Sequence, residues 1–196
     1  FPVTFSLVPG DLVQNGAHYE RWKQEWFDPM GPLIARLPVF PALGNHEENH
    51  PFYFSYFSLP ENRSKDFRGH WYFFDYGNVR FITLDTNEKY RNSEQLTWLA
   101  SMLANAEARD DIDFVVAQFH HPFRSELWVD GNTEYSGTIE RMLRQFSAVT
   151  GKPSFNVHGH THGYSRGHAF NSPHTILTVS SLGGDIDTWG EKNQRI

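Results

Sequence analysis

The sequence contains no cysteine, which excludes disulfide bridges and thiolate metal sites. It also lacks any block of lysine and arginine, and its formal net charge is −6, so we expect no nucleic-acid partner. No apolar run approaches the length of a transmembrane helix and no signal peptide is visible, so we expect no membrane partner.

Aromatic residues are abundant: they make up 16% of the 196 residues, and 39% of the chain is hydrophobic. A chain of this size and composition buries a real core, and we expect one domain over residues 1–196. The chain opens at Phe1 rather than at methionine, so we interpret this domain as incomplete at its N-terminus.

Segments with strand character alternate with segments of helical spacing. Strands are predicted over residues 1–8, 38–43, 112–119, 155–157 and 175–180, the last ending at Gly183-Gly184, with a hairpin over 71–76 and 79–84. Helices are predicted over 16–27, stopped by Pro29 and Pro32, over 93–106, capped by Ser93, and over 137–149. Residues 48–68 show no clear period and are expected to form a long ordered loop with at most short helices. The alternation predicts an α/β domain with some antiparallel character.

Polar side chains follow four of the predicted strands directly. They are Asp11, Asn45, His120 and His160. In open α/β sheets, ligands bind outside the carboxyl ends of the strands, so we expect these side chains to converge on one crevice.

Histidines stand at alternate positions in the stretch 156–166, as His158, His160 and His162. This stretch is either a metal-binding turn or a histidine-rich surface loop. Imidazole, carboxylate and amide oxygen together suit Zn, Mn, Fe or Co. Asp11 has two oxygens and can bridge two ions, and a pair of ions about 3.5–4 Å apart is the usual arrangement for displacement at phosphorus. The convergence of ligand-type residues favours the metal site.

Four short motifs occur in the order found in a known family. They are Gly10-Asp11, Gly44-Asn45-His46-Glu47, His120-His121-Pro122 and Gly159-His160-Thr161-His162. The chain resembles the calcineurin-like metallophosphoesterases over nearly its whole length. It is most similar to the purple acid phosphatase branch, because Tyr164 and Arg166 follow the last motif.

The resemblance implies a four-layer α/β/β/α sandwich, here without its first strand. It implies two transition-metal ions chosen from Fe, Zn, Mn and Co, with Asp11 as the bridging ligand. Asn45, His120 and His160 would hold one ion, and His162 the other. His46 would contact the phosphoryl group and protonate the leaving oxygen, which suits an imidazole near neutral pH. The alternative for His46 is a structural histidine that is hydrogen-bonded beneath the site.

Two departures from the family pattern affect the metal site. The earliest motif, an aspartate on the first strand, is absent, so either it lies upstream or the chain holds one ion firmly and a second weakly. Gln14 stands where purple acid phosphatases have a tyrosine ligand, so we expect no purple iron centre.

The sequence thus predicts hydrolysis of phosphate esters, mainly small monoesters, by a metal-bound hydroxide. The alternatives are a non-catalytic metal-binding or scaffolding domain and a metal-dependent hydrolase of another substrate. We expect His121 either to support the site or to face substrate, or to have no special role. His158 is expected to be buried and hydrogen-bonded. The family branch suggests a secreted or periplasmic protein.

Overall fold

The computed structural model describes residues 3–125 and 127–180. The strands are β1 Ser6–Val8, β2 Val39–Pro41, β3 Tyr72–Tyr76, β4 Val79–Thr83, β5 Phe114–Phe119, β6 Ser154–His158, β7 Tyr164–His168 and β8 His174–Val179. The helices are α1 Tyr19–Arg21, α2 Asp28–Ile34, α3 Pro51–Tyr56, α4 Ser93–Glu107 and α5 Glu134–Thr150. A π-helical segment, η1, covers Trp22–Phe27, and two 3₁₀ turns, η2 and η3, cover Glu88–Tyr90 and Val129–Gly131.

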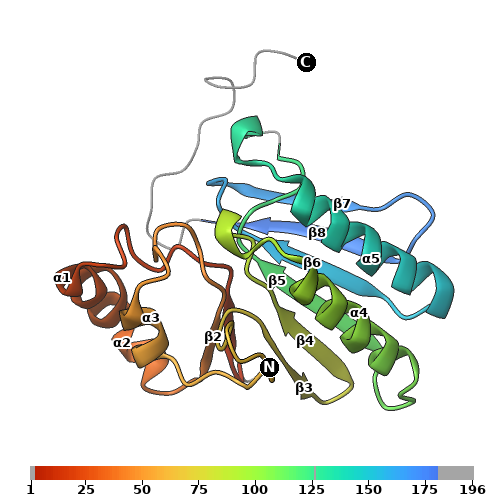
Figure 1. Cartoon of the computed structure of the whole chain (residues 1–196), viewed down its shortest axis with the longest axis horizontal. Coiled ribbons are helices and arrows are strands. Elements are labelled where there is room, and N and C mark those ends of the chain that lie inside the picture. The colour runs from red at the N-terminus through yellow and green to blue at the C-terminus, as the bar shows by residue number, and fades with distance from the viewer. Residues whose placement is uncertain (1–2, 126, 181–196) are drawn as a thin grey trace.

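Two sheets form the middle of the molecule (Figure 1). In the larger one the strand order is β3-β4-β5-β6-β8-β7, with β4, β5, β6 and β8 parallel and the two edge strands antiparallel to their neighbours. In the smaller one β1 and β2 are parallel, with Ser6 opposite Val39. Rings from both sheets meet between them: Phe40 stacks on Phe74 at 4.0 Å, and Phe5 contacts both rings edge-on.

Helices cover the outer side of each sheet. Apolar residues of α4 and α5, such as Leu99 and Leu143, pack with Ile82 and Val115 of the larger sheet. Trp22, Trp26 and Tyr53 belong to a second core, against β1 and β2. In Figure 1, α4 and α5 lie over the larger sheet and α1 to α3 lie beyond the smaller one. The predicted four-layer α/β/β/α architecture is therefore confirmed.

The ends of the long helices follow from local chemistry. Asn92 caps α4 by accepting the N–H of Gln95, so the predicted cap, Ser93, is one residue too late. Thr133 caps α5, and Gly151 ends it with a φ of 75°, a left-handed conformation that glycine adopts without strain.

Two local predictions are wrong. The first helical region does not stop at Pro29 but continues from η1 directly into α2 and runs to Ile34, with Pro29 in the first turn of α2 and Pro32 inside it. Strand β7 was not expected, since all five of its residues are exposed and no apolar alternation marks it. The predicted strand end at Gly183-Gly184 lies outside the described residues.

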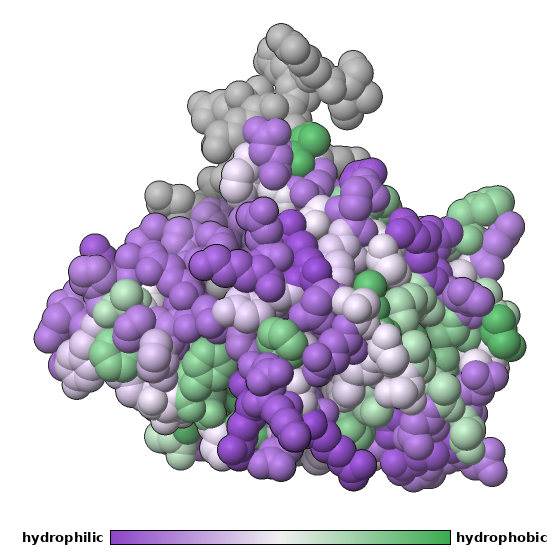
Figure 2. Space-filling view, viewed as in Figure 1, coloured by the Kyte–Doolittle hydropathy of each residue, from purple (hydrophilic) through white to green (hydrophobic). Residues whose placement is uncertain are grey.

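No helix within the described residues is both long and apolar enough to cross a lipid bilayer. The face shown in Figure 2 is mostly hydrophilic.

Candidate metal centre

The candidate site lies where strands of both sheets end. Asp11 follows β1, Asn45 follows β2, His120 follows β5 and His160 follows β6. Because β1 is parallel to β2 and β5 is parallel to β6, the carboxyl ends of each pair point the same way. The structure therefore brings together the four residues that the sequence places at strand ends.

The Nε2 atom of His120 is the centre of this cluster. It lies 3.0 Å from Asp11 Oδ2, 3.0 Å from Asn45 Oδ1 and 3.1 Å from His160 Nδ1. Ligands of a zinc-like ion lie about 2.0–2.2 Å from it, so ligand atoms around one ion are necessarily only a few ångströms apart. The spacing and chemistry of these four donors fit one borderline transition-metal ion.

The main chain fixes the tautomer of His120, which is fully buried. Its Nδ1 lies 2.8 Å from the carbonyl oxygen of Pro9. A carbonyl oxygen only accepts, so Nδ1 carries the proton and donates it. The lone pair of Nε2 on the neutral ring then faces Asp11, Asn45 and His160. A second hydrogen bond that orients the ring in this way is typical of metal-ligating histidines.

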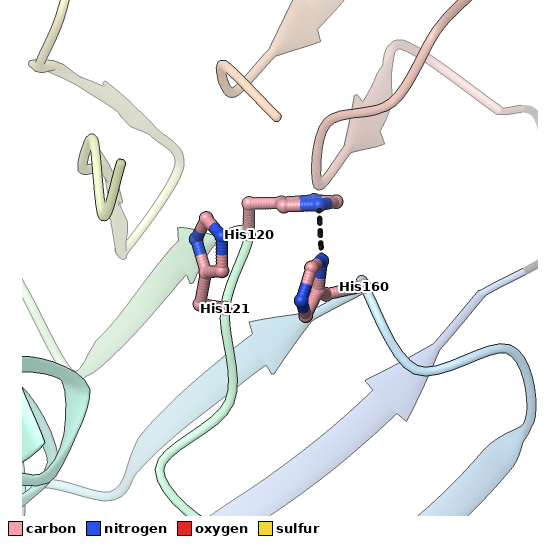
Figure 3. Close-up of side chains that lie close together, drawn as sticks. All are labelled: His120, His121 and His160. Atoms are coloured by element: carbon pink, nitrogen blue, oxygen red, sulfur yellow. Dashed lines mark hydrogen bonds between the residues drawn. The ribbon is translucent and has the colours of Figure 1, made fainter. Parts of the chain in front are cut away.

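His160 presents its Nδ1, rather than its Nε2, to the cluster. The residue has a φ of 67°, and its Nδ1 is turned toward His120 (Figure 3). The other side of the ring is covered: a methyl group added at Gly131 would lie 2.8 Å from Cδ2 and 3.0 Å from Nε2 of His160. The indole of Trp128 packs on the same imidazole, with ring centroids 4.8 Å apart at 33°. Segment 127–131 therefore packs against the Nε2 side of His160 and leaves Nδ1 available for a metal ion.

His121 is the third histidine of the cluster. One ring nitrogen from each of His120, His121 and His160 lies within 4.8 Å of the others, a group that could hold a metal ion. The ring centroid of His121 is 4.3 Å from that of His160 and 4.9 Å from that of His120. The Nδ1 of His121 lies 3.0 Å from Thr86 Oγ1, which also accepts the main-chain N–H of His121.

His46 and His162 stand at the edge of the cluster. The Nδ1 of His46 donates to the carbonyl oxygen of Gln14 at 2.9 Å, and its Nε2 lies 4.0 Å from Asp11 Oδ2. His162 is half-buried and is outside the three-histidine group, but it lies near enough to His160 for its charge to lower the pKa of that ring. The role of His162 as a ligand therefore stays a prediction.

The fully buried carboxylate of Glu47 holds two of the site loops together. It accepts the main-chain N–H groups of Asp11 at 3.0 Å, Leu12 at 2.7 Å and Gly44 at 2.6 Å. The sequence analysis assigned no role to Glu47, because nothing in its local pattern shows that the side chain is buried. Its position directly after Asn45 and His46 was the only available signal.

Two glycines are required by the close approach of these loops. A methyl group on Gly44 would lie 2.2 Å from Asp11 Oδ1. Gly10 has a φ of 90°, and a methyl group there would lie 2.7 Å from His120 Nδ1. No side chain fits at either position, which explains the glycines beside Asp11 and Asn45.

Burial and mutual charge set the ionisation of the metal-free site. Burial alone would raise the pKa of Asp11, but His120 outweighs it and lowers that pKa to about 2. Burial opposes the charged form of His120, whereas the Asp11 carboxylate raises its pKa. Burial lowers the pKa of His121 to about 2 and that of His160 to about 3. Burial and the Asp11 charge raise the pKa of Glu47 to about 7, against the effect of its N–H donors. The two rings with lowered pKa are neutral near pH 7, the state in which histidine binds metal.

Two further predictions can be compared with the structure. His158 is buried as expected, and its Nδ1 has no hydrogen-bond partner among the described residues, so the expected hydrogen bond of this ring stays a prediction for Nε2. Gln14 is exposed, and its main chain, not its side chain, contacts His46.

Comparisons with known proteins agree with this fold. A family model described as calcineurin-like phosphoesterase matches residues 2–164. The chain is 32% identical over 186 residues to an uncharacterised protein of Mycobacterium tuberculosis, a match that covers 84% of this chain and 35% of that protein. It is 33% identical over 126 residues to purple acid phosphatase 13 of Arabidopsis thaliana, covering 59% of this chain and 23% of the relative. Other Arabidopsis relatives are named probable inactive purple acid phosphatases.

A solved structure shows the same architecture. The purple acid phosphatase PPD1 of yellow lupin superposes with a TM-score of 0.72 at 17% identity, over 90% of this chain and 36% of that one. The fold and the cluster at its strand ends define an α/β domain with a group of side chains of the kind that bind metal ions. The family match is more specific: the chain belongs to the calcineurin-like phosphoesterase family. It spans about a third of the length of the M. tuberculosis relative.

Proposed function

We propose that this chain carries the catalytic centre of a metal-dependent phosphoesterase that hydrolyses small phosphate monoesters. The proposal rests on one observation above all, the position of His120 Nε2 within 3.1 Å of donor atoms from Asp11, Asn45 and His160. Family membership adds the reaction class, because the matching model describes phosphoesterases.

Asp11, Asn45, His120 and His160 would hold one ion. His162, together with the second oxygen of Asp11, would contribute to a second ion. A bound ion of this kind lowers the pKa of a water molecule to give a hydroxide nucleophile, and it withdraws charge from the phosphoryl oxygens. Fe, Zn, Mn and Co all suit this set of ligands.

His46 would donate a proton to the leaving oxygen. Because the carbonyl oxygen of Gln14 keeps the Nδ1 proton, Nε2 is the nitrogen at which His46 exchanges a proton with substrate. This nitrogen lies on the side of Asp11, 4.0 Å from Oδ2, and therefore near the position of the ion. A histidine in this position acts as a general acid when Nε2 is protonated.

The second candidate function is a non-catalytic metal-binding or scaffolding domain. The relatives named probable inactive purple acid phosphatases favour it, because their names describe them as proteins without catalytic activity. The two functions differ in one measurable property, which is turnover of a phosphate ester by the metal-loaded protein.

Substitution of two residues separates metal binding from catalysis. We expect Asp11→Ala to lose both metal and activity, and His46→Ala to keep its metal while turnover of an aryl phosphate monoester falls about 100-fold or more. His18→Ala is the matched control, because His18 is exposed and its side chain forms no cap hydrogen bond. Full turnover by His46→Ala would remove the catalytic role, and a metal-loaded wild type without turnover would favour the scaffolding domain.

A further inference from the structure

Among the three grouped histidines, His121 has surroundings that differ from those of a metal ligand. His120 gives its Nδ1 proton to a main-chain carbonyl oxygen, that of Pro9, which leaves the lone pair of Nε2 free. His121 instead has a hydroxyl group, Thr86 Oγ1, 3.0 Å from its Nδ1. A hydroxyl group can either donate or accept, so its other contacts decide the direction of this hydrogen bond.

Thr86 donates its proton to His121. The hydroxyl oxygen already accepts the main-chain N–H of His121 at 2.9 Å. In the part of the chain that the structure describes, the hydroxyl of Thr86 forms hydrogen bonds only with the main chain and ring of His121. Thr86 is fully buried, so water does not take the hydroxyl proton. The hydroxyl proton therefore goes to Nδ1, and the ring proton of His121 is on Nε2.

The position of His121 is held from both sides. Its main-chain carbonyl oxygen accepts the hydroxyl of Ser136, at the start of α5, at 2.7 Å, while Thr86 follows β4. Figure 3 shows one ring nitrogen of His121 turned toward His120 and His160 and the other turned away. The proton on Nε2 is thus presented to the space in front of the two ligand histidines.

We propose that His121 is a hydrogen-bond donor to a phosphoryl oxygen of the substrate, with its tautomer fixed by Thr86, and that it is not a metal ligand. The proposal rests on the proposed function for the identity of the substrate. A protonated Nε2 has no lone pair for a metal ion, whereas an N–H group beside the ion stabilises the negative charge that a phosphoryl oxygen carries.

The first test measures the tautomer in the metal-free protein. Long-range proton–nitrogen NMR correlations of the imidazole rings distinguish a proton on Nδ1 from one on Nε2, and the spectrum of His121→Phe identifies the signals of His121. We expect Nε2 to be protonated in the wild type and in Thr86→Ser, which keeps the hydroxyl. A proton on Nδ1 of the neutral wild-type ring would overturn the proposal. This experiment does not depend on activity.

The second test separates a ligand from a donor. Zinc affinity and the affinity of the zinc-loaded protein for inorganic phosphate are measured by calorimetry for wild type, His121→Phe and His121→Gln. We expect His121→Phe to bind zinc like the wild type and phosphate about 10- to 100-fold more weakly, the loss typical of one hydrogen bond to a charged group. His121→Gln keeps an N–H donor near the same place and is expected to recover part of the phosphate affinity.

The outcomes distinguish this inference from the proposed function. Loss of zinc affinity in His121→Phe would make His121 a ligand and overturn the inference. Unchanged phosphate affinity in that variant would also overturn it. If the wild type binds zinc and phosphate but hydrolyses no ester, the proposed function fails, while these two affinities still decide the role of His121.

Discussion

Gly131 offers a direct way to disturb His160 without changing any candidate ligand. A methyl group at this position would lie 2.8 Å from His160 Cδ2, 3.0 Å from His160 Nε2 and 2.9 Å from Trp128 Cε3. Carbon atoms in contact are normally about 3.5–4.0 Å apart, so Gly131→Ala requires both the imidazole and the indole to move by roughly 0.5–1 Å. The same ring carries Nδ1, which lies 3.1 Å from His120 Nε2.

A movement of this size exceeds what a metal site tolerates, since distances from ligand to ion hold within about 0.2 Å. We therefore expect Gly131→Ala to lower zinc affinity about 10- to 100-fold, the range found when groups that orient a ligand are lost. Calorimetric titration of the metal-free protein measures the affinity. Urea unfolding of the metal-free variant shows whether the fold persists.

Gly31→Ala is the matched control, because Gly31 lies in α2 and a methyl group there would meet nothing within 4 Å. Its zinc affinity should equal that of the wild type. Wild-type zinc affinity in Gly131→Ala would show that segment 127–131 does not position His160, and the reasoning would be refuted.

Three other predictions address acid stability, the buried ion pair and the metal type. Burial lowers the pKa of His158 to about 3, below its unfolded value of 6.5, so its stabilising contribution is present above pH 6.5 and is lost as pH falls toward 3. When the pH falls from 6.5 to 5, the free energy of unfolding of the metal-free wild type should drop by about 2 kcal/mol more than that of the metal-free His158→Phe variant. Urea titrations at the two pH values measure both drops, and equal drops would contradict this. Asp75→Ala removes the carboxylate that binds the buried Arg80 at 2.8 Å and should cost about 3–5 kcal/mol in urea unfolding, so a cost below about 1 kcal/mol would contradict the pairing. The iron-loaded protein should show no tyrosinate charge-transfer band in its visible spectrum, because Gln14 replaces the tyrosine, and a purple product would contradict this expectation.

The sequence predicts the order of elements well because hydrophobic periodicity follows which face each element buries. The alternation of strand and helix signals led to the observed α/β layers, and the signal at Gly77-Asn78 placed the hairpin of β3 and β4 correctly. Prediction from the sequence failed where burial produces no periodic pattern of hydrophobic residues. Strand β7 is exposed along its whole length, and the region around Pro29 stays helical despite its two prolines.

The candidate site was predicted in part for a similar reason. Asp11, Asn45, His120 and His160 follow strands, and parallel strands bring their ends together, so their proximity follows from local pattern and topology. Their roles as ligands, and the roles of His46 and His162, stay predictions.

The contacts that orient these residues could not be predicted. Glu47 binds main-chain N–H groups of residues more than 30 positions away, and Thr86 meets His121 across 35 positions. Segment 127–131 packs against His160. Such contacts depend on how loops from different strands pack, and no spacing in the sequence encodes them.

The most direct test of the central claim is elemental analysis of the purified, dialysed chain together with hydrolysis of a chromogenic phosphate monoester. The account predicts at least one equivalent of a transition metal per chain, turnover that a chelator abolishes, and recovery when the metal is added back. A chain that contains metal but shows no turnover, or turnover that survives complete removal of the metal, would contradict it.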